Sequence, residues 1–306
     1  MDWRILVNCI IRFWLGIKYY SLMFSWLSTE TVMMHRILIV EVSFILLVFF
    51  PFMESIVVPN FTLCLDTFYL REPPKGFNNP NTIDICVNTD DSNGEYYYAI
   101  KYDLYMHIPL YAAYQVNSFS GNVRRSTTWR MENDLPTKQQ NNTYFQASVK
   151  DYSGSTYDRG HLFPALYNQN STEQMFSTFT LINAAPMSTK LNRGPWKTVE
   201  SITHRLLNDS CTFPGAKRFV ITGTVPGENR TKNATDGINI PKLVWNAIYC
   251  YSSHAEEMLV HTGWSRGHLA NQTGLGYRTV SIGELNSILT EHMSVDHLVE
   301  LFHINP

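Results

Sequence analysis

The amino-acid sequence predicts a single α+β domain over residues 58–306. Runs of β-branched and aromatic residues, typical of strands, alternate with amphipathic segments, typical of helices. After residue 60 the chain contains no internal repeat, low-complexity tract or obvious linker. Its 306 residues are 44% hydrophobic, which is sufficient for one large core.

The first half of this domain predicts strands and a short helix. Residues 96–116 are dense in aromatic and β-branched side chains and predict a pair of strands, with Pro109 at an edge or bend. Ser171 and Gln174 have capping-box spacing, which predicts the start of a short helix. The apolar run at 176–186 then predicts a buried strand.

Between these elements lies a polar segment, residues 117–156, which predicts an irregular loop that lays Arg124, Arg125 and Arg130 over a binding surface. The whole chain has a formal charge of −2, which argues against coating nucleic acid by bulk electrostatics. Residues 120–220, however, contain 12 Lys or Arg and 7 Asp or Glu. Any phosphate contact is therefore expected from a local basic patch.

The second half predicts three strands and three helices. Pro195 suits a first helical turn, and apolar residues follow it at helical spacing, at positions 196, 199, 202, 206 and 207. Two more helices are expected from Ser281, which has capping-box spacing with Glu284, and from Ser294. Strands are expected at 218–225, 238–250 and 257–265.

Residues 1–57 predict an N-terminal extension that includes a secretory signal. His35 and Arg36 precede an apolar run at 37–50, which is the order found in such signals. Cleavage is expected between Ser55 and Val58, so the protein is expected to be secreted.

A membrane anchor is the alternative interpretation of this extension. Residues 1–32 are also rich in apolar side chains, although a true start at Met33 or Met34 explains them equally well. The run at 37–50 has only 14 residues and contains Glu41, whereas a spanning helix needs ~20 apolar residues. Secretion is therefore the favoured interpretation.

Glycosylation sequons and cysteines also favour export. Seven Asn-X-Ser/Thr sequons begin at Asn60, Asn141, Asn170, Asn208, Asn229, Asn233 and Asn271. Four cysteines follow the signal, too widely spread for a zinc knuckle and compatible with two disulfides. Cys211 with Cys250 is the favoured pair because both flank predicted strands, and the partner of Cys64 stays open.

One short motif, Asp-Arg-Gly-His at 158–161, suggests catalysis. His161 is suited to act as a general base, because an imidazole can take a proton from water near neutral pH. The chain has ten histidines, so this signal is weak alone. It is strengthened by Asn183, Asn192 and Glu200, which follow at intervals of 9 and 8 residues.

The order Asp-Arg-Gly-His, Asn, Leu-Asn-X-Gly-X-Trp, Glu resembles the DNA/RNA non-specific endonuclease family, over roughly residues 60–303. With the signal, the cysteines and the Tyr-rich strands, the chain is most similar to secreted vertebrate members. The resemblance implies a ββα-metal fold with a mixed, mainly antiparallel sheet flanked by helices.

The resemblance also implies roles for individual residues. His161 matches the general base, and Asn192 matches the side-chain ligand of a single Mg²⁺, for which Mn²⁺ could substitute. Glu200 matches the acid that holds metal-bound water. A sparse set of oxygen ligands suits Mg²⁺, which retains several waters.

Other matches concern support and substrate binding. Asn183 matches a residue that supports the site, and Arg159 is expected to position the phosphate or the loop. An upstream arginine normally faces the phosphate, for which Arg125 is the first candidate and Arg124 the second. The partner of Asp158 cannot be assigned from the sequence.

The resemblance thus implies a secreted Mg²⁺-dependent endonuclease that cuts DNA and RNA with little sequence preference and leaves 5′-phosphate ends. The alternative is a weakly active or inactive family member that serves as an extracellular binding module. His204 stands where the family often has an arginine, and Met187 where it often has glutamine. A second Arg-Gly-His at 266–268 lacks the aspartate, and we expect His268 to be structural.

Overall fold

The computed structural model describes residues 55–88, 96–117, 121–126, 128–137, 145–168, 171–231, 237–252, 263–293 and 298–304. Chain contacts separate Met1–Pro51 from Phe52–Pro306. The predicted signal run and the alternative anchor lie outside the described residues. In the described part of the chain, no helix is both long and apolar enough to cross a membrane.

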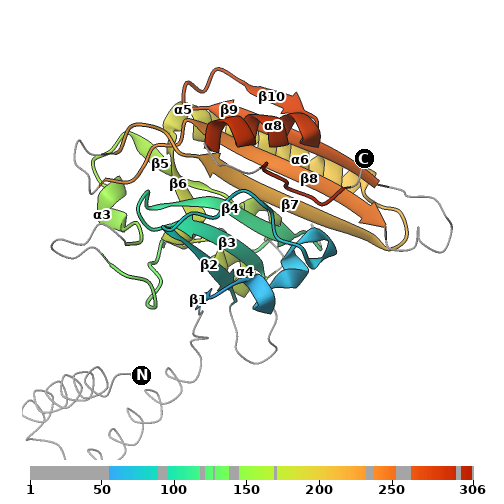
Figure 1. Cartoon of the computed structure of the whole chain (residues 1–306), viewed down its shortest axis with the longest axis horizontal. Coiled ribbons are helices and arrows are strands. Elements are labelled where there is room, and N and C mark those ends of the chain that lie inside the picture. The colour runs from blue at the N-terminus through green and yellow to red at the C-terminus, as the bar shows by residue number, and fades with distance from the viewer. Residues whose placement is uncertain are drawn as a thin grey trace, which may run out of the picture. The chain divides into compact units, whose positions relative to one another are not determined.

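Within the described residues, eight strands form one antiparallel sheet (Figure 1). Their order across the sheet is β1 Ser55–Val58, β2 Thr82–Val87, β3 Tyr98–Asp103, β4 Ile108–Gln115, β7 Ala216–Val225, β8 Leu243–Ser252, β9 Gly263–Asn271 and β10 Tyr277–Val280. The predicted α+β class with a mainly antiparallel sheet is therefore confirmed. The predicted strand pair corresponds to β3 and β4, and Pro109 lies beside a register shift between them.

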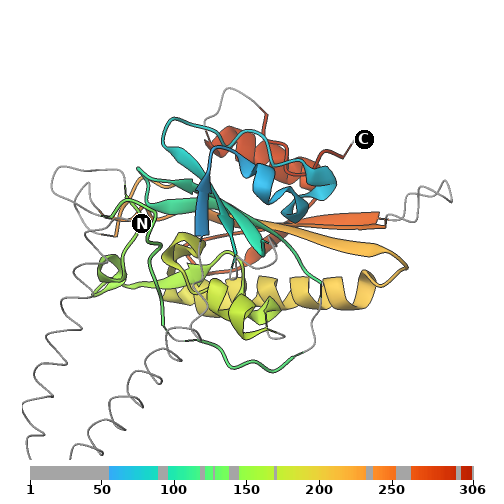
Figure 2. The ribbon, with the colours of Figure 1, turned by 90° about the horizontal axis from the view of Figure 1, so that it is seen from below.

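Helices and turns cover both faces of the sheet. In Figure 2, α8 (Ile282–Met293, red) and the 3₁₀ turns between Phe61 and Arg71 (blue) lie on one face. Helices α6 (Lys197–Ser210) and α4 (Thr172–Ser177) lie on the other. Because side chains alternate along a strand, Tyr111 of β4 joins the core beneath α8, and Tyr114 joins the core beneath α6.

A smaller two-stranded sheet leads into α6. It pairs β5 (Tyr157–His161) with β6 (Ala184–Ser188), and α3 (Val149–Tyr152) precedes β5. After β6 the chain forms α5 (Thr189–Leu191), a π-helical turn at Asn192–Trp196, and then α6. This β-β-α unit carries most of the predicted site residues.

The helical segment begins earlier than predicted. Ser188 caps it by accepting a hydrogen bond from the Leu191 amide (3.2 Å), so Pro195 lies inside the π-turn rather than in a first turn. Asn192 is consequently within a helical segment and not before one. The cap explains the difference, since the Ser188 hydroxyl satisfies an amide that would otherwise lack a partner.

The run at 176–186 is buried from Ser177 onwards but is a strand only from Ala184. Its first residues end α4, and Leu181–Asn183 form a 3₁₀ turn. The Asn183 side chain donates to the Thr178 carbonyl (3.0 Å), which stabilises the turn in place of a strand. Residues 181–183 are therefore buried without being part of a strand.

Several boundaries toward the C-terminus also differ from the prediction. Strand β7 matches the strand expected at 218–225, and β8 starts at Leu243, later than the expected 238. Strand β9 starts at Gly263, and residues 257–262 lie outside the described residues. Helix α8 starts as predicted, with Ser281 Oγ accepting from the Glu284 amide (3.1 Å). The helix expected from Ser294 is wrong for residues 298–304, where Glu300 instead pairs its backbone with Lys75.

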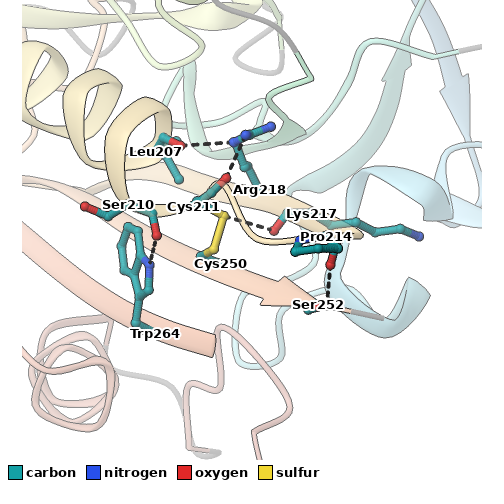
Figure 3. Close-up of a disulfide and its surroundings, with 9 residues drawn as sticks. All are labelled: Leu207, Ser210, Cys211, Pro214, Lys217, Arg218, Cys250, Ser252 and Trp264. Carbon is teal, nitrogen blue, oxygen red and sulfur yellow. Dashed lines mark hydrogen bonds between the residues drawn. A yellow bond between two sulfur atoms is a disulfide. The ribbon is translucent and has the colours of Figure 1, made fainter. Parts of the chain in front are cut away.

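Two disulfides join described cysteines. Cys211–Cys250 confirms the favoured pair, and Cys64 bonds Cys86. Figure 3 shows that Cys211 lies directly after α6 and is linked to β8, while Arg218 donates to the carbonyls of Leu207 (3.0 Å) and Cys211 (2.7 Å). The C-terminal end of α6 is thus fixed to the sheet, which also fixes the rest of that helix.

Candidate active site

His161 is the last residue of β5, and Asn183 fixes the backbone beyond it. The Asn183 side chain accepts from the Phe163 amide (2.8 Å) and donates to the Phe163 carbonyl (3.0 Å). The Leu162 amide also donates to the Asn183 carbonyl (3.0 Å). Asn183 is fully buried, so it acts as a support that holds the chain at His161.

The imidazole of His161 is buried between two aromatic rings. Its centroid lies 4.6 Å from that of Trp129 and 4.7 Å from that of Phe179. Burial, reinforced by the charges of Arg125 and Arg159, lowers the pKa of His161 to about 3. Among the described residues, Nε2 has no hydrogen-bond partner. The side chain is therefore neutral at pH 7, with one ring nitrogen uncommitted.

Two arginines from different segments approach His161. The Arg159 guanidinium carbon lies 5.3 Å from the centroid of Trp129, and that of Arg125 lies 5.4 Å from the centroid of Phe179. The charge of Arg125 also acts on Glu200. Arg125 and Arg124 are the two upstream candidates for the arginine that faces the phosphate. Of these, Arg125 is the one whose charge acts on both His161 and Glu200.

Arg130, also expected at this surface, has a structural role. Its Nη1 donates to the carbonyl of Phe176 (2.7 Å), and its Nε lies 3.5 Å from Oε1 of the buried Glu132. These contacts hold the upstream loop against the end of α4. The expectation that Arg130 lies over a binding surface stays a prediction.

Asp158 binds the two residues at the start of the π-turn. It accepts from Nδ2 of Asn192 (3.1 Å) and forms a bidentate pair with Arg193 (2.9 and 3.0 Å). Partial burial raises the pKa of Asp158, but the hydrogen bonds from Arg193 and Asn192 outweigh this effect and lower it overall. The ionised carboxylate therefore fixes the Asn192 amide with Nδ2 toward Asp158, which leaves Oδ1 available.

The partly buried Glu200 projects from α6. Burial raises its pKa to about 7, against the opposing charges of Arg125 and Lys197. The hydroxyl of Tyr167 donates to the Glu200 carbonyl (2.9 Å), which ties the segment after His161 to this helix. His204, one turn further, lies with its ring 6.0 Å from that of Tyr167.

The π-turn affects how Asn192 and Glu200 face one another. An α-helix turns about 100° per residue, so residues eight apart lie about 80° out of line. Gly194 departs from helical geometry at this turn (φ −112°, ψ −106°), so the helical segment is kinked between Asn192 and Glu200 and does not follow a regular helix there.

The oxygen atoms at this site suit a metal bound by few protein ligands. Within the described residues, no group of three or more His, Cys, Asp or Glu could hold an ion. Zinc commonly requires such a group. Oδ1 of Asn192 and the Glu200 carboxylate are oxygen donors of the kind that hard divalent cations prefer.

Comparison with known proteins assigns the family. The sequence profile of the DNA/RNA non-specific endonucleases matches residues 80–293. The chain belongs to this family. The match includes every predicted site residue, from Arg125 to Glu200, and confirms the resemblance suggested by the Asp-Arg-Gly-His motif.

Relatives of this chain match it over different shares of their length. Endonuclease domain-containing 1 protein from Homo sapiens is 26% identical over 269 residues, which cover 81% of this chain and 47% of that protein. A nuclease from Nostoc sp. is 26% identical over 206 residues, which cover 67% of this chain and 68% of that protein. This chain thus spans about half the length of the human relative.

A solved structure was also compared with this endonuclease-family chain. A chain from the crystal structure of the EndoG/EndoGI complex matches with a TM-score of 0.49 and 19% sequence identity. The match covers 68% of this chain and 84% of that one.

Three site features of this family member were not predicted from its sequence. Trp129 and Phe179 flank His161, and Arg193 pairs with Asp158. Trp129 is one of several aromatic residues in the segment 117–156, so the sequence did not mark it out. Arg193 directly follows Asn192, but the sequence does not show that it reaches back to Asp158.

Proposed function

We propose that this protein is a secreted endonuclease that hydrolyses phosphodiester bonds in DNA and RNA, with Mg²⁺ as its metal and Mn²⁺ as a substitute. The observation that carries the proposal is the setting of His161. It is buried and neutral, its Nε2 is unpartnered among the described residues, and two arginines act on it.

His161 would act as the general base. A neutral imidazole can accept a proton from a water molecule that attacks phosphorus. The low pKa makes His161 a weak base in the free protein, in part because Arg125 and Arg159 are positively charged. A bound phosphate would neutralise that charge, so we expect substrate to raise the pKa of His161 and strengthen it as a base.

Arg125 and Arg159 would bind the phosphate. Guanidinium groups pair with phosphate oxygens through two parallel hydrogen bonds, and they recognise the backbone rather than the bases. Cleavage with little sequence preference follows from such contacts. The local excess of basic residues around this site is consistent with a polyanionic substrate.

Asn192 would hold the metal through Oδ1, since Asp158 takes its Nδ2. Glu200 would accept hydrogen bonds from water on the metal, and Asn183 would keep the His161 segment in place. When bound, the divalent ion would stabilise negative charge on the phosphate and on the departing 3′ oxygen, leaving a 5′-phosphate end.

Exposed sequons and the two disulfides support secretion. The sequon asparagines that lie within the described residues, Asn60, Asn208, Asn229 and Asn271, are all exposed. Disulfides persist in oxidising compartments. Strand β1 spans Ser55–Val58, the interval in which cleavage is predicted, so cleavage inside it would remove part of the strand and cleavage just before Ser55 would leave it complete. N-terminal sequencing of the mature protein tests this part of the proposal.

Plasmid nicking by the purified, glycosylated protein tests the reaction. We expect relaxed and then linear DNA with Mg²⁺ or Mn²⁺, degradation of RNA under the same conditions, and no product in EDTA. Tight, metal-independent binding of nucleic acid without cleavage over hours would contradict the proposal and support the extracellular binding module instead.

A further inference from the structure

Three polar side chains form a row across the sheet face that carries α8. Asp84 of β2 is the register partner of Lys101 in β3, and Lys101 is the partner of Tyr111 in β4. Directly opposed residues of neighbouring strands point to the same face. Tyr111 packs in the core beneath α8, so all three side chains lie on the face opposite α6.

This row is costly to bury. Lys101 is 6% exposed, and its Nζ lies 2.5 Å from Oδ1 of Asp84. Tyr111 is fully buried, and its hydroxyl has no hydrogen-bond partner among the described residues. Apolar residues in place of a buried ion pair are often neutral or stabilising, and an unpaired hydroxyl is unfavourable. Stability alone therefore does not explain these residues.

The row lines a cavity of about 480 Å³. This volume falls within the range typical of small-molecule sites. Phe61, Pro73 and Pro74 supply apolar walls. Exposed residues that also line the cavity are Asn60, Lys75, Asn78 and Leu298.

The unused hydrogen-bonding capacity in this cavity is mainly that of donors. An ammonium group carries three N–H donors, and Lys101 gives one to Asp84 while it lies 5.5 Å from the centroid of Phe61. Tyr111 adds a hydroxyl donor. Lys75 adds a second cation, 3.2 Å from Oε2 of Glu300. The only carboxylate among the lining residues is Asp84, which Lys101 already engages.

We propose that this cavity binds a small organic anion, a carboxylate or sulfonate on an apolar body. Its charged oxygens accept hydrogen bonds from Lys101 and Tyr111, and its body packs against Phe61, Pro73 and Pro74. The site is separate from the one at His161, because its lining residues come from the opposite face of the sheet. Its occupation does not depend on the proposed nuclease reaction.

Titration of the full-length protein with 8-anilinonaphthalene-1-sulfonate tests the proposal, with fluorescence as the readout. We expect one saturable site, from which phenylacetate displaces the dye and the uncharged 2-phenylethanol does not. Displacement by 2-phenylethanol at equal concentrations, or stronger displacement by phenethylamine, would contradict an anion site.

Two variants assign the site to the polar row. The double variant Asp84→Asn, Lys101→Met removes both charges without leaving one unpaired, and we expect dye affinity to fall at least about tenfold. Tyr111→Phe removes only the unpartnered hydroxyl, so it should fold normally and lower affinity about fivefold. Unchanged affinity in folded Tyr111→Phe and in the double variant would overturn the assignment.

Matched control variants come from the other face of the large sheet, which carries α6. Tyr114 lies in the same strand, and its hydroxyl contacts Thr222 (2.9 Å) in the opposite core. Tyr114→Phe and His161→Ala should both bind the dye as wild type does. A loss of binding in either control equal to that in Tyr111→Phe would show that the dye is not reporting on this cavity.

Discussion

Two Arg-Gly-His segments of this protein have the same local chemistry in different surroundings. His161 ends β5 and His268 lies within β9, and both are almost fully buried. Burial lowers the pKa of both, to about 3 and about 4, and a neighbouring arginine adds to the effect in each case. Each has a ring nitrogen without a partner among the described residues.

The difference lies in what surrounds each imidazole. Before the first segment, Asp158 holds Asn192 and Arg193, whereas Ser265 occupies the equivalent place before the second. A second arginine, Arg125, acts on His161 and also on Glu200. A depressed histidine pKa therefore does not identify a catalytic base. The neighbouring groups that we propose to bind phosphate and metal distinguish His161 from His268.

The largest predicted effect separates the two histidines. His161→Ala should lower the rate of plasmid cleavage by about a thousandfold, because a general base contributes on that order. His268→Ala should stay within about fivefold of wild type once the folded fraction is matched by circular dichroism. Equal losses of cleavage rate in the two variants would contradict a catalytic role that is specific to His161.

A smaller effect is predicted for the arginine beside His161. Arg125→Ala should lower the rate about a hundredfold, since it removes a positive group aimed at the charge that develops on phosphate. Arg124→Ala should change the rate less than about threefold. Initial rates on a defined oligonucleotide at fixed ionic strength measure both, and the reverse ranking would assign the phosphate contact to Arg124.

Asp158 is predicted to act by positioning Asn192. Asp158→Asn should lower the rate about tenfold and raise the Mg²⁺ concentration needed for half-maximal activity by a similar factor, because groups that orient a ligand tune metal affinity. Ser265→Ala is the matched control and should change neither quantity. A reduced rate with an unchanged Mg²⁺ requirement would indicate a purely structural role.

The smallest predicted effect concerns the pH dependence of the free energy of unfolding, to which both histidines contribute. A folded-state pKa of about 3 for His161 means that, below the unfolded value near 6.5, only the unfolded chain binds the proton. The free energy of unfolding should therefore fall with decreasing pH between those values, by at most about 1.4 kcal/mol per pH unit. His161→Gln should flatten this slope, and His268→Gln should do so above about pH 4. Urea unfolding from pH 7 to pH 4 measures both.

The sequence predicted the family better than it predicted the contacts between the candidate site residues. The order of His161, Asn183, Asn192 and Glu200 was sufficient for the family, because short-range spacing carries that signal. The pairing of Asp158 with Arg193 joins residues 35 positions apart and depends on how β5 packs beside the π-turn. Local sequence carries no information about such a distance.

The prediction of helices and strands has the same limit, because local sequence does not show tertiary packing. Capping residues correctly placed the starts of α4 and α8, since Ser171 and Ser281 each bond an amide three residues on. Apolar content alone wrongly predicted a strand at 176–183, where the chain ends α4 and forms a 3₁₀ turn around the buried Phe179 and Leu181. The outer strands β1, β2 and β10 were not predicted.

The most direct test of the central claim is the pKa of each histidine measured by NMR in the full-length protein, with and without a short DNA duplex in EDTA. We expect low pKa values for both free histidines, and a rise for His161 alone on DNA binding as Arg125 and Arg159 engage phosphate. A His161 pKa that DNA leaves unchanged, or that moves together with the His268 value, would contradict it.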